Sequence, residues 1–130
     1  MDGAARNADI RFHRPLQWTP REIAAKEAVP IALVMNELIL NAVKHGNAEQ
    51  GPVTVDMEEG ARPGGVRVRI SNPGSWSPDH STSRVGLQLV ETLLPRQGAT
   101  LSCVIGSGRI ETLVELEPPV ISPAHTEMQS

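Results

Sequence analysis

A polar stripe on an otherwise apolar helix is the feature of this sequence best suited to chemistry. The pattern of residues 30–46 predicts a helix that is apolar almost all round, with polar residues recurring at spacings of three and four. These residues are Glu37, Asn41, Lys44 and His45. A carboxylate, an amide and a cation on one face indicate a binding or catalytic site. The alternative is the solvated face of an amphipathic helix.

The choice of residues in this helix favours a site. A helix that is apolar almost all round is typically buried. Asparagine competes for backbone hydrogen bonds, so Asn36 and Asn41 in mid-helix each cost roughly 0.5 kcal/mol relative to alanine. We therefore expect at least one of them to be retained for another purpose.

The composition of the chain limits the classes of protein to which it can belong. The chain has 130 residues, which predicts one domain, and its net charge of −3 without a long Lys/Arg run argues against nucleic acid as a partner. A single cysteine, Cys103, excludes a disulfide framework; we expect a buried, inert thiol in a reducing cytoplasm. No apolar run approaches the ~20 residues of a membrane span, so we expect no membrane contact by this domain. A membrane-anchored parent protein is compatible with that expectation.

The remaining sequence predicts the elements that position the stripe. Thr19 and Pro20 predict the start of a short helix that ends near residue 28, and Pro30 restarts or kinks the chain into the long helix. Residues 71–83 form a polar loop rich in proline and glycine, and loops of this length are often lids or binding loops. Alternating patterns predict an edge strand at 10–14, hairpins at 53–70 and 100–116, and a helix at 84–97.

This order of elements predicts an α+β fold. We expect a two-layer α/β sandwich in which about three helices cover one face of a mixed, mostly antiparallel sheet. Residues 10–118 form the domain, while residues 1–9 and 119–130 are predicted to be a disordered leader and tail.

Three segments resemble the ATP-binding fold shared by DNA gyrase and sensor histidine kinases, known as the Bergerat or GHKL fold. NELILNAVKHG at 36–46 resembles the N box of this superfamily, ISNPGSW at 70–76 its first glycine motif, and SRVGLQLV at 83–90 its second. The resemblance covers residues 10–118 and implies a site for ATP with Mg²⁺.

The N-box resemblance implies separate roles for the stripe residues. Asn41 matches the asparagine that binds the metal, and its amide oxygen is the hard ligand that Mg²⁺ prefers. Glu37 matches the general base that holds an attacking water or hydroxyl. Lys44 supplies positive charge for phosphate, and His45 packs on the sugar or base, or caps the helix end.

The first glycine motif implies contacts with the base. Asn72 stands where the superfamily usually has an aspartate that accepts a hydrogen bond from the adenine amino group, and an asparagine oxygen can still accept it. Gly74 lets the backbone approach the base. Trp76 replaces the second glycine of the motif; it stacks on the nucleotide or fills the pocket, or else is an exposed loop aromatic.

The second glycine motif implies phosphate binding at a helix start. Gly86 and Leu87 open this helix, whose free N–H groups favour phosphate, and Arg84 stands where another glycine is common and can add a charged contact. The alternative is that Gly86 only permits close packing. Thr112 matches a threonine that supports the adenine-binding residue, or is an ordinary strand residue.

The resemblance is greatest to the catalytic, ATP-binding domain of a two-component sensor histidine kinase. Such a domain transfers the γ-phosphoryl group, through Mg²⁺, to a histidine on a dimerisation domain in the same or a partner chain, with a response regulator downstream. His13, His80 and His125 do not suit that acceptor, since none is predicted on an amphipathic helix with acidic neighbours. We therefore expect an excised domain, or one acting in trans, that binds nucleotide without phosphorylating itself.

Two other functions fit the same residues. NAVKHGN also resembles the N box of anti-sigma-factor serine kinases, which bind a sigma factor and phosphorylate an antagonist. A degenerate, non-catalytic binding module with the same fold is the other alternative, and Asn72, Trp76 and Arg84 are the features that favour it.

Overall fold

A five-stranded sheet forms one layer of the fold. The computed structural model describes residues 10–18, 20–45, 51–74, 84–106 and 108–124; for residues 45 and 84–87 it describes the backbone alone. In order across the sheet the strands are β1 (Ile10–His13), β3 (Val53–Glu59), β4 (Val66–Pro73), β6 (Arg109–Leu116) and β5 (Ala99–Gly106). β1 is parallel to β3, and the other pairs are antiparallel. The predicted mixed, mostly antiparallel sheet is confirmed.

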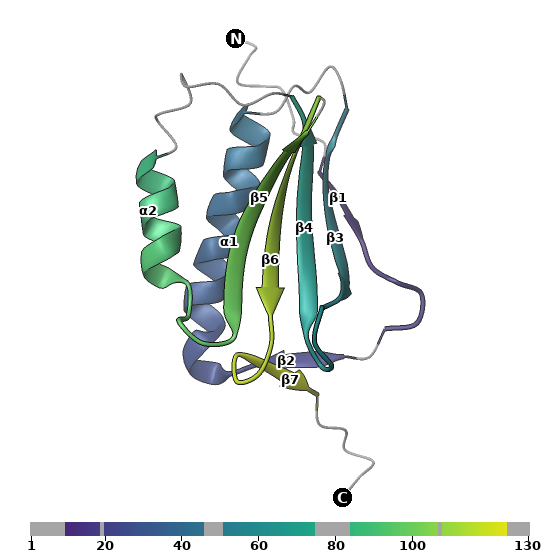
Figure 1. The fold of residues 1–130 in the computed structure, drawn as a ribbon, viewed down its shortest axis with the longest axis vertical. Helices are drawn as coiled ribbons and strands as arrows, with labels where there is room; N and C mark the ends of the chain where they lie inside the picture. Colours follow the sequence, from purple (N-terminus) through teal and green to yellow (C-terminus); the bar gives the residue numbers. More distant parts are fainter. Residues whose placement is uncertain (1–9, 19, 46–50, 75–83, 107, 125–130) are drawn as a thin grey trace, which may run out of the picture.

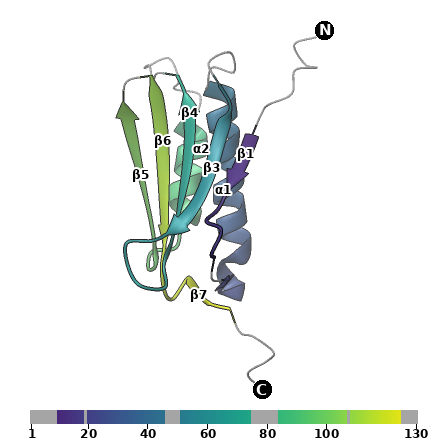
Figure 2. The same cartoon turned by 90° about the vertical axis from the view of Figure 1, so that its right-hand side faces the viewer.

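Two helices cover one face of this sheet in the described part of the chain. They are α1 (Ala25–His45) and α2 (Arg84–Leu93), and they lie side by side in opposite directions (Figures 1 and 2). The predicted two-layer α+β architecture is therefore confirmed, but the expected number of about three helices is too high. Neither helix is both long and apolar enough to cross a membrane.

The missing helix is the one predicted to begin at Thr19. Residues 21–23 instead form strand β2 (Arg21–Ile23), which pairs with β7 (Ile121–Pro123), and α1 then begins at Ala25 and continues through Pro30. Burial of Ile31 and Val34 on the sheet outweighs the one backbone hydrogen bond that Pro30 cannot donate. Thr19 itself lies outside the described residues.

The second helix is also shorter than predicted. α2 ends at Leu93 rather than near residue 97. Leu94 precedes Pro95, and a residue before proline is disfavoured in the helical conformation. Gly98 then turns the chain with a φ of +86° into β5.

An aliphatic core fills the space between the two layers. Alternate residues of β3, β4 and β6 face the helices, and buried residues of both helices pack onto them. Val34, Ile70, Val90, Val114 and Val120 are the largest fully buried side chains. Every buried apolar residue of this core is aliphatic in the described part of the chain.

The C-terminal segment belongs to the domain. Val120 and Ile121 are buried in the core, and β7 pairs with β2 along its whole length. The prediction of a disordered tail from residue 119 is therefore wrong for these residues. Residues 125–130, like residues 1–9 of the predicted leader, lie outside the described residues.

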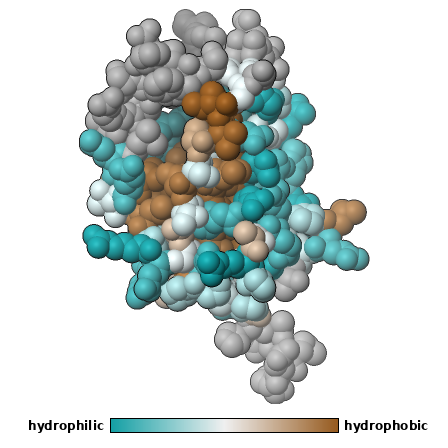
Figure 3. Space-filling view, in the orientation of Figure 1, coloured by the Kyte–Doolittle hydropathy of each residue, from teal (hydrophilic) through white to brown (hydrophobic). Residues whose placement is uncertain are grey.

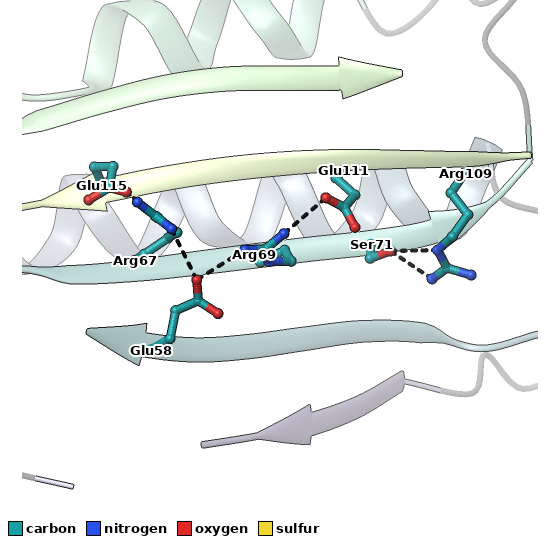
Figure 4. Close-up of polar contacts among 7 residues, drawn as sticks. All are labelled: Glu58, Arg67, Arg69, Ser71, Arg109, Glu111 and Glu115. Atoms are coloured by element: carbon teal, nitrogen blue, oxygen red, sulfur yellow. Dashed lines mark hydrogen bonds and ion pairs between the residues drawn. The ribbon is translucent and has the colours of Figure 1, made fainter. Parts of the chain in front are cut away.

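The face of the sheet opposite the helices carries a network of charges (Figure 4). Arg69 contacts Glu58 at 3.0 Å and Glu111 at 3.1 Å, and Arg67 contacts Glu58 at 3.3 Å and also Glu115. Hydrogen bonding to Glu115 raises the pKa of Arg67, and hydrogen bonding to Glu58 raises that of Arg69. This cross-strand network keeps three strands in register on a face that no described helix covers.

Candidate functional site

Three segments of the chain meet at one end of the molecule. α1 ends there, β4 ends there, and α2 begins there (Figure 1). α1 packs against both β4 and α2. Since α1 carries the predicted N box, and β4 and α2 carry the glycine motifs, the fold brings the three motifs to the same end.

The helix α1 places Glu37 and Asn41 at the border of the core. Both are half-buried and lie one turn apart, next to the buried Leu38 and Ala42, whereas Lys44 in the last turn is exposed. The most exposed face of α1 is a different one, formed by Val29, Leu33, Asn36 and Leu40. The backbone of His45 ends the helix, and its side chain lies outside the described part.

Asn72 is buried at the end of β4. Only 4% of its surface is exposed, and it faces the helices, as Ile70 and Val68 do. Its Nδ2 donates a hydrogen bond to the carbonyl oxygen of Pro73 at 3.1 Å. Among the described residues no donor meets Oδ1, so this oxygen is left to accept a hydrogen bond. A carboxylate could not donate to Pro73 in this way.

Gly74 starts the loop that follows β4. Its φ of +137° is accessible to glycine and strained for other residues. Its N–H donates to the carbonyl oxygen of Gly108 at 2.9 Å, which ties the loop to the turn between β5 and β6. The sequence identified that turn but carries no signal for this contact.

Thr112 lies next to Asn72 on the helix-facing side of the sheet. It is opposite Ile70 in β4, while Asn72 is opposite Ile110, which makes Thr112 and Asn72 diagonal neighbours on one face. On its other side Thr112 is opposite Cys103 in β5. Burial raises the pKa of the Cys103 thiol, and a hydrogen bond with Thr112 opposes this effect.

The environment predicted for Cys103 is wrong. We expected a buried thiol, but Cys103 is exposed. β5 is the outer strand of the sheet, and burial along it falls from Ala99, which is buried, to the exposed residues 102–106.

The second glycine motif forms the first turn of α2. The backbones of Arg84, Gly86 and Leu87 lie in this turn, and their side chains are outside the described part, as is the whole of Trp76. The first N–H groups of a helix have no partner within it, so this turn can donate to phosphate oxygens.

The described residues contain no cluster of three or more His, Cys, Asp or Glu side chains that could hold a metal. Mg²⁺ does not require such a cage, since it keeps several waters and is commonly bound by one or two protein oxygens together with substrate phosphates. The half-buried amide of Asn41 is a suitable protein oxygen for that kind of site.

Comparison with known proteins points to one family. Residues 15–100 match the model of a family described as histidine kinase-like ATPase domain. The catalytic domain of the histidine kinase ThkA has a similar structure, with a TM-score of 0.63 and 18% identity over 84% of this chain and 78% of that one.

Two further solved structures have the same fold. The histidine kinase domain of the blue-light activated histidine kinase EL346 from Erythrobacter litoralis aligns with a TM-score of 0.63 and 19% identity over 88% of this chain. The Acinetobacter baumannii histidine kinase AdeS aligns with a TM-score of 0.60 and 14% identity over 86% of it. This chain spans 56% of each of these two chains. A search of curated proteins finds no match.

Proposed function

We propose that this chain is the ATP-binding catalytic domain of a sensor histidine kinase. The premise is that the chain belongs to the histidine kinase-like ATPase domain family. The observation that supports the proposal is that α1, which carries Glu37 and Asn41, ends at the end of the fold where β4, which carries Asn72, also ends and where α2 begins (Figure 1). The supporting chemistry is that these groups suit a metal-bound triphosphate and a purine base.

Each residue would contribute a separate interaction. The Oδ1 atom of Asn72 accepts a hydrogen bond from the adenine amino group, while its Nδ2 stays bonded to Pro73. The first turn of α2 and the exposed Lys44 meet the phosphates, and Asn41 would hold Mg²⁺. When bound, Mg²⁺ neutralises the charge on the phosphate oxygens. Glu37, one turn before Asn41, orients the attacking hydroxyl, water or imidazole and accepts its proton.

The phosphoryl acceptor is proposed to lie on another domain. Within the described residues His13 is on β1, where its Nδ1 contacts Asp56 at 3.0 Å, and β1 is at one edge of the sheet. We propose instead a histidine on a helical dimerisation domain, in the same chain or a partner chain, with a response regulator as the next acceptor. Since the proposed substrate is ATP, we propose a cytoplasmic location for this function.

Calorimetric titration with a non-hydrolysable ATP analogue and Mg²⁺ tests the site. We expect Asn41→Ala to lose Mg²⁺-dependent binding while keeping its helical circular dichroism signal. Asn36→Ala is the matched control, because Asn36 is the same residue type in the same helix but on the exposed face. Binding by Asn41→Ala as tight as that of the wild type would show that the site is wrongly assigned. Absence of binding by the wild type at millimolar nucleotide would favour the degenerate binding module.

A serine kinase of the anti-sigma-factor type is the second candidate, favoured by the sequence NAVKHGN at 41–47. The two functions differ in the acceptor residue. Acid treatment of the phosphorylated partner separates them, because phosphohistidine is hydrolysed in acid and phosphoserine is not.

A further inference from the structure

The outer edge of β5 is a long, free strand edge. β5 is the last strand of the five-stranded sheet, and no strand of the described chain pairs with its other side (Figure 2). In an antiparallel ladder alternate residues of the outer strand direct their N–H and C=O groups away from the sheet. These groups are a template for another extended strand.

The two edges of the sheet differ in how they are protected. β1 has four residues, includes Arg11 and His13, and is followed by Arg14 and Pro15. Short length, charge and proline are the usual devices that prevent edge pairing. β5 has eight residues, ATLSCVIG, with no charge and no proline. The absence of these devices marks β5 as an edge that can accept a partner.

The side chains near the end of β5 are apolar and accessible. Val104 is 51% exposed on one face of the strand, and Ile105 is 54% exposed on the other. The space-filling view shows apolar atoms open to solvent on the side of the molecule where β5 lies (Figure 3). A second strand alongside β5 would cover both side chains.

We propose that β5 pairs antiparallel with β5 of a second copy of this chain, so that the five strands of each copy form one continuous sheet. A two-fold axis perpendicular to the sheet relates the copies, and the same residue of each copy then faces itself at the centre. Because β5 carries no charge, no register of such a pair places like charges opposite each other. This self-compatibility favours a second copy over an unrelated strand.

The register follows from the side chains. With Cys103 opposite Cys103 of the second copy, Leu101 lies opposite Ile105 on the helix-facing side, and Ser102 lies opposite Val104 on the other side. This register covers the exposed Ile105 with an apolar side chain at both ends of the pair. One strand from each copy buries less than the ~800 Å² per partner of a standard interface, so we expect a dimer that dissociates on dilution.

Oxidative cross-linking tests this register, because Cys103 is the only cysteine. Directly opposed side chains have Cβ atoms ~4.5–5.5 Å apart, close enough for a disulfide after a small adjustment. We expect mild oxidation of the full chain to give a disulfide-linked dimer. In a Cys103→Ser, Ile105→Cys variant the thiols also occupy an exposed position but lie roughly 13 Å apart along the strand, and we expect little cross-linking.

Mixing two variants checks the opposed pair directly. The Cys103→Ser, Ile105→Cys chain should cross-link readily with a Cys103→Ser, Leu101→Cys chain, because these positions face each other in the proposed register. Equal cross-linking of Cys103 and of the cysteine at position 105 in the unmixed samples would overturn the register.

Sedimentation equilibrium across a range of protein concentrations tests the dimer itself. We expect the wild type to shift from monomer to dimer with rising concentration, and Val104→Lys to stay monomeric with an unchanged melting temperature. Leu16→Lys is the control, since it adds the same charge at a fully exposed position outside β5. A wild type that is monomeric at millimolar concentration, or a Val104→Lys variant that dimerises equally, would overturn the proposal. Binding of an unrelated extended peptide to a monomeric wild type would also overturn it.

Discussion

Replacing Asn72 by aspartate should destabilise the protein, although aspartate is the residue that the family resemblance leads one to expect there. Asn72 is 4% exposed, and its Nδ2 donates to the carbonyl oxygen of Pro73 at 3.1 Å. Asn72→Asp removes this donor and places a carboxylate oxygen against the same carbonyl. The variant therefore loses a hydrogen bond and gains a buried repulsion.

The size of the effect follows from the burial of both groups. A buried polar group left without its partner costs about 1–3 kcal/mol. For a domain of this length 1 kcal/mol lowers the melting temperature by roughly 3–5 °C, so a loss of about 2 kcal/mol corresponds to roughly 6–10 °C.

The loss should depend on pH. Burial raises the pKa of the introduced carboxyl in the folded state above its unfolded value of about 3.9. Below that unfolded pKa the protonated group can again donate to Pro73, so the variant is close to the wild type. As the pH rises from the unfolded pKa through the folded pKa this stabilisation is lost, and the deficit is complete above the folded pKa.

Thermal unfolding followed by circular dichroism measures both effects. Asn72→Ala is the control, because it removes the donor without adding a charge and should show a smaller, pH-independent loss. Saturating ATP and Mg²⁺ should restore part of the stability of Asn72→Asp if the carboxylate accepts a hydrogen bond from the adenine amino group. A variant as stable as the wild type at neutral pH would mean that the amide does not donate to Pro73. The assignment of Oδ1 to the base would then be wrong.

Three further predictions concern catalysis, backbone packing and thiol reactivity. Glu37→Gln should keep nucleotide affinity but slow phosphoryl transfer to a separately supplied acceptor domain by roughly a hundredfold to ten-thousandfold, and an unchanged rate would contradict its role as base. Gly64→Ala should lower the free energy of unfolding, measured by urea denaturation, by about 1–2 kcal/mol because of its φ of +81°. Gly98→Ala (φ +86°) should lower it clearly more, because its Cβ would also lie 2.6 Å from a backbone oxygen. Equal losses of stability would contradict this packing. Thr112→Val should slow alkylation of Cys103 at mildly alkaline pH. Burial raises the pKa of this thiol, and the variant loses the hydrogen bond with Thr112 that lowers the pKa. The alkylation rate measured against pH tests this, and an unchanged profile would exclude the hydrogen bond.

Elements with a strong period were predictable from the sequence. Val66, Val68 and Ile70 alternate with Arg67 and Arg69, and this pattern marks the strand and its buried face. The hairpins and the long helix are predictable for the same reason. These patterns depend only on which side of a single element is buried, so they can be read from the residues of that element alone.

The errors arose where a distant partner decides the structure. Thr19 and Pro20 are a good helix start, but the residues that follow form a strand because Ile121 pairs with Ile23. No local pattern near either residue shows the other. Likewise the exposure of Cys103 depends on its strand being outermost, which the order of elements along the chain does not determine.

Some features of the candidate site were likewise predictable from the sequence, and others were not. The spacing of Glu37 and Asn41 placed them on one face of α1, and their half-burial agrees with that expectation. The donor role of Asn72 toward Pro73 and the position of Thr112 beside it depend on side-chain conformation and strand register. These follow from three-dimensional packing and cannot be obtained from residue types alone.

The pairing of β2 with β7 also has a consequence for the order of folding. Ile23 immediately precedes α1, and its partner Ile121 belongs to the last strand of the domain. Closing a loop of that size costs more entropy than closing the short loop of a hairpin, so the pairing is expected to form after the hairpins, whose contacts are local. During synthesis this pairing can therefore form only after β7 has left the ribosome, whereas Arg21 of β2 can contact Glu59 and the carbonyl oxygen of Gly64 earlier. A chain arrested before β7 would carry every predicted nucleotide-contacting residue but would lack the strand that pairs with β2.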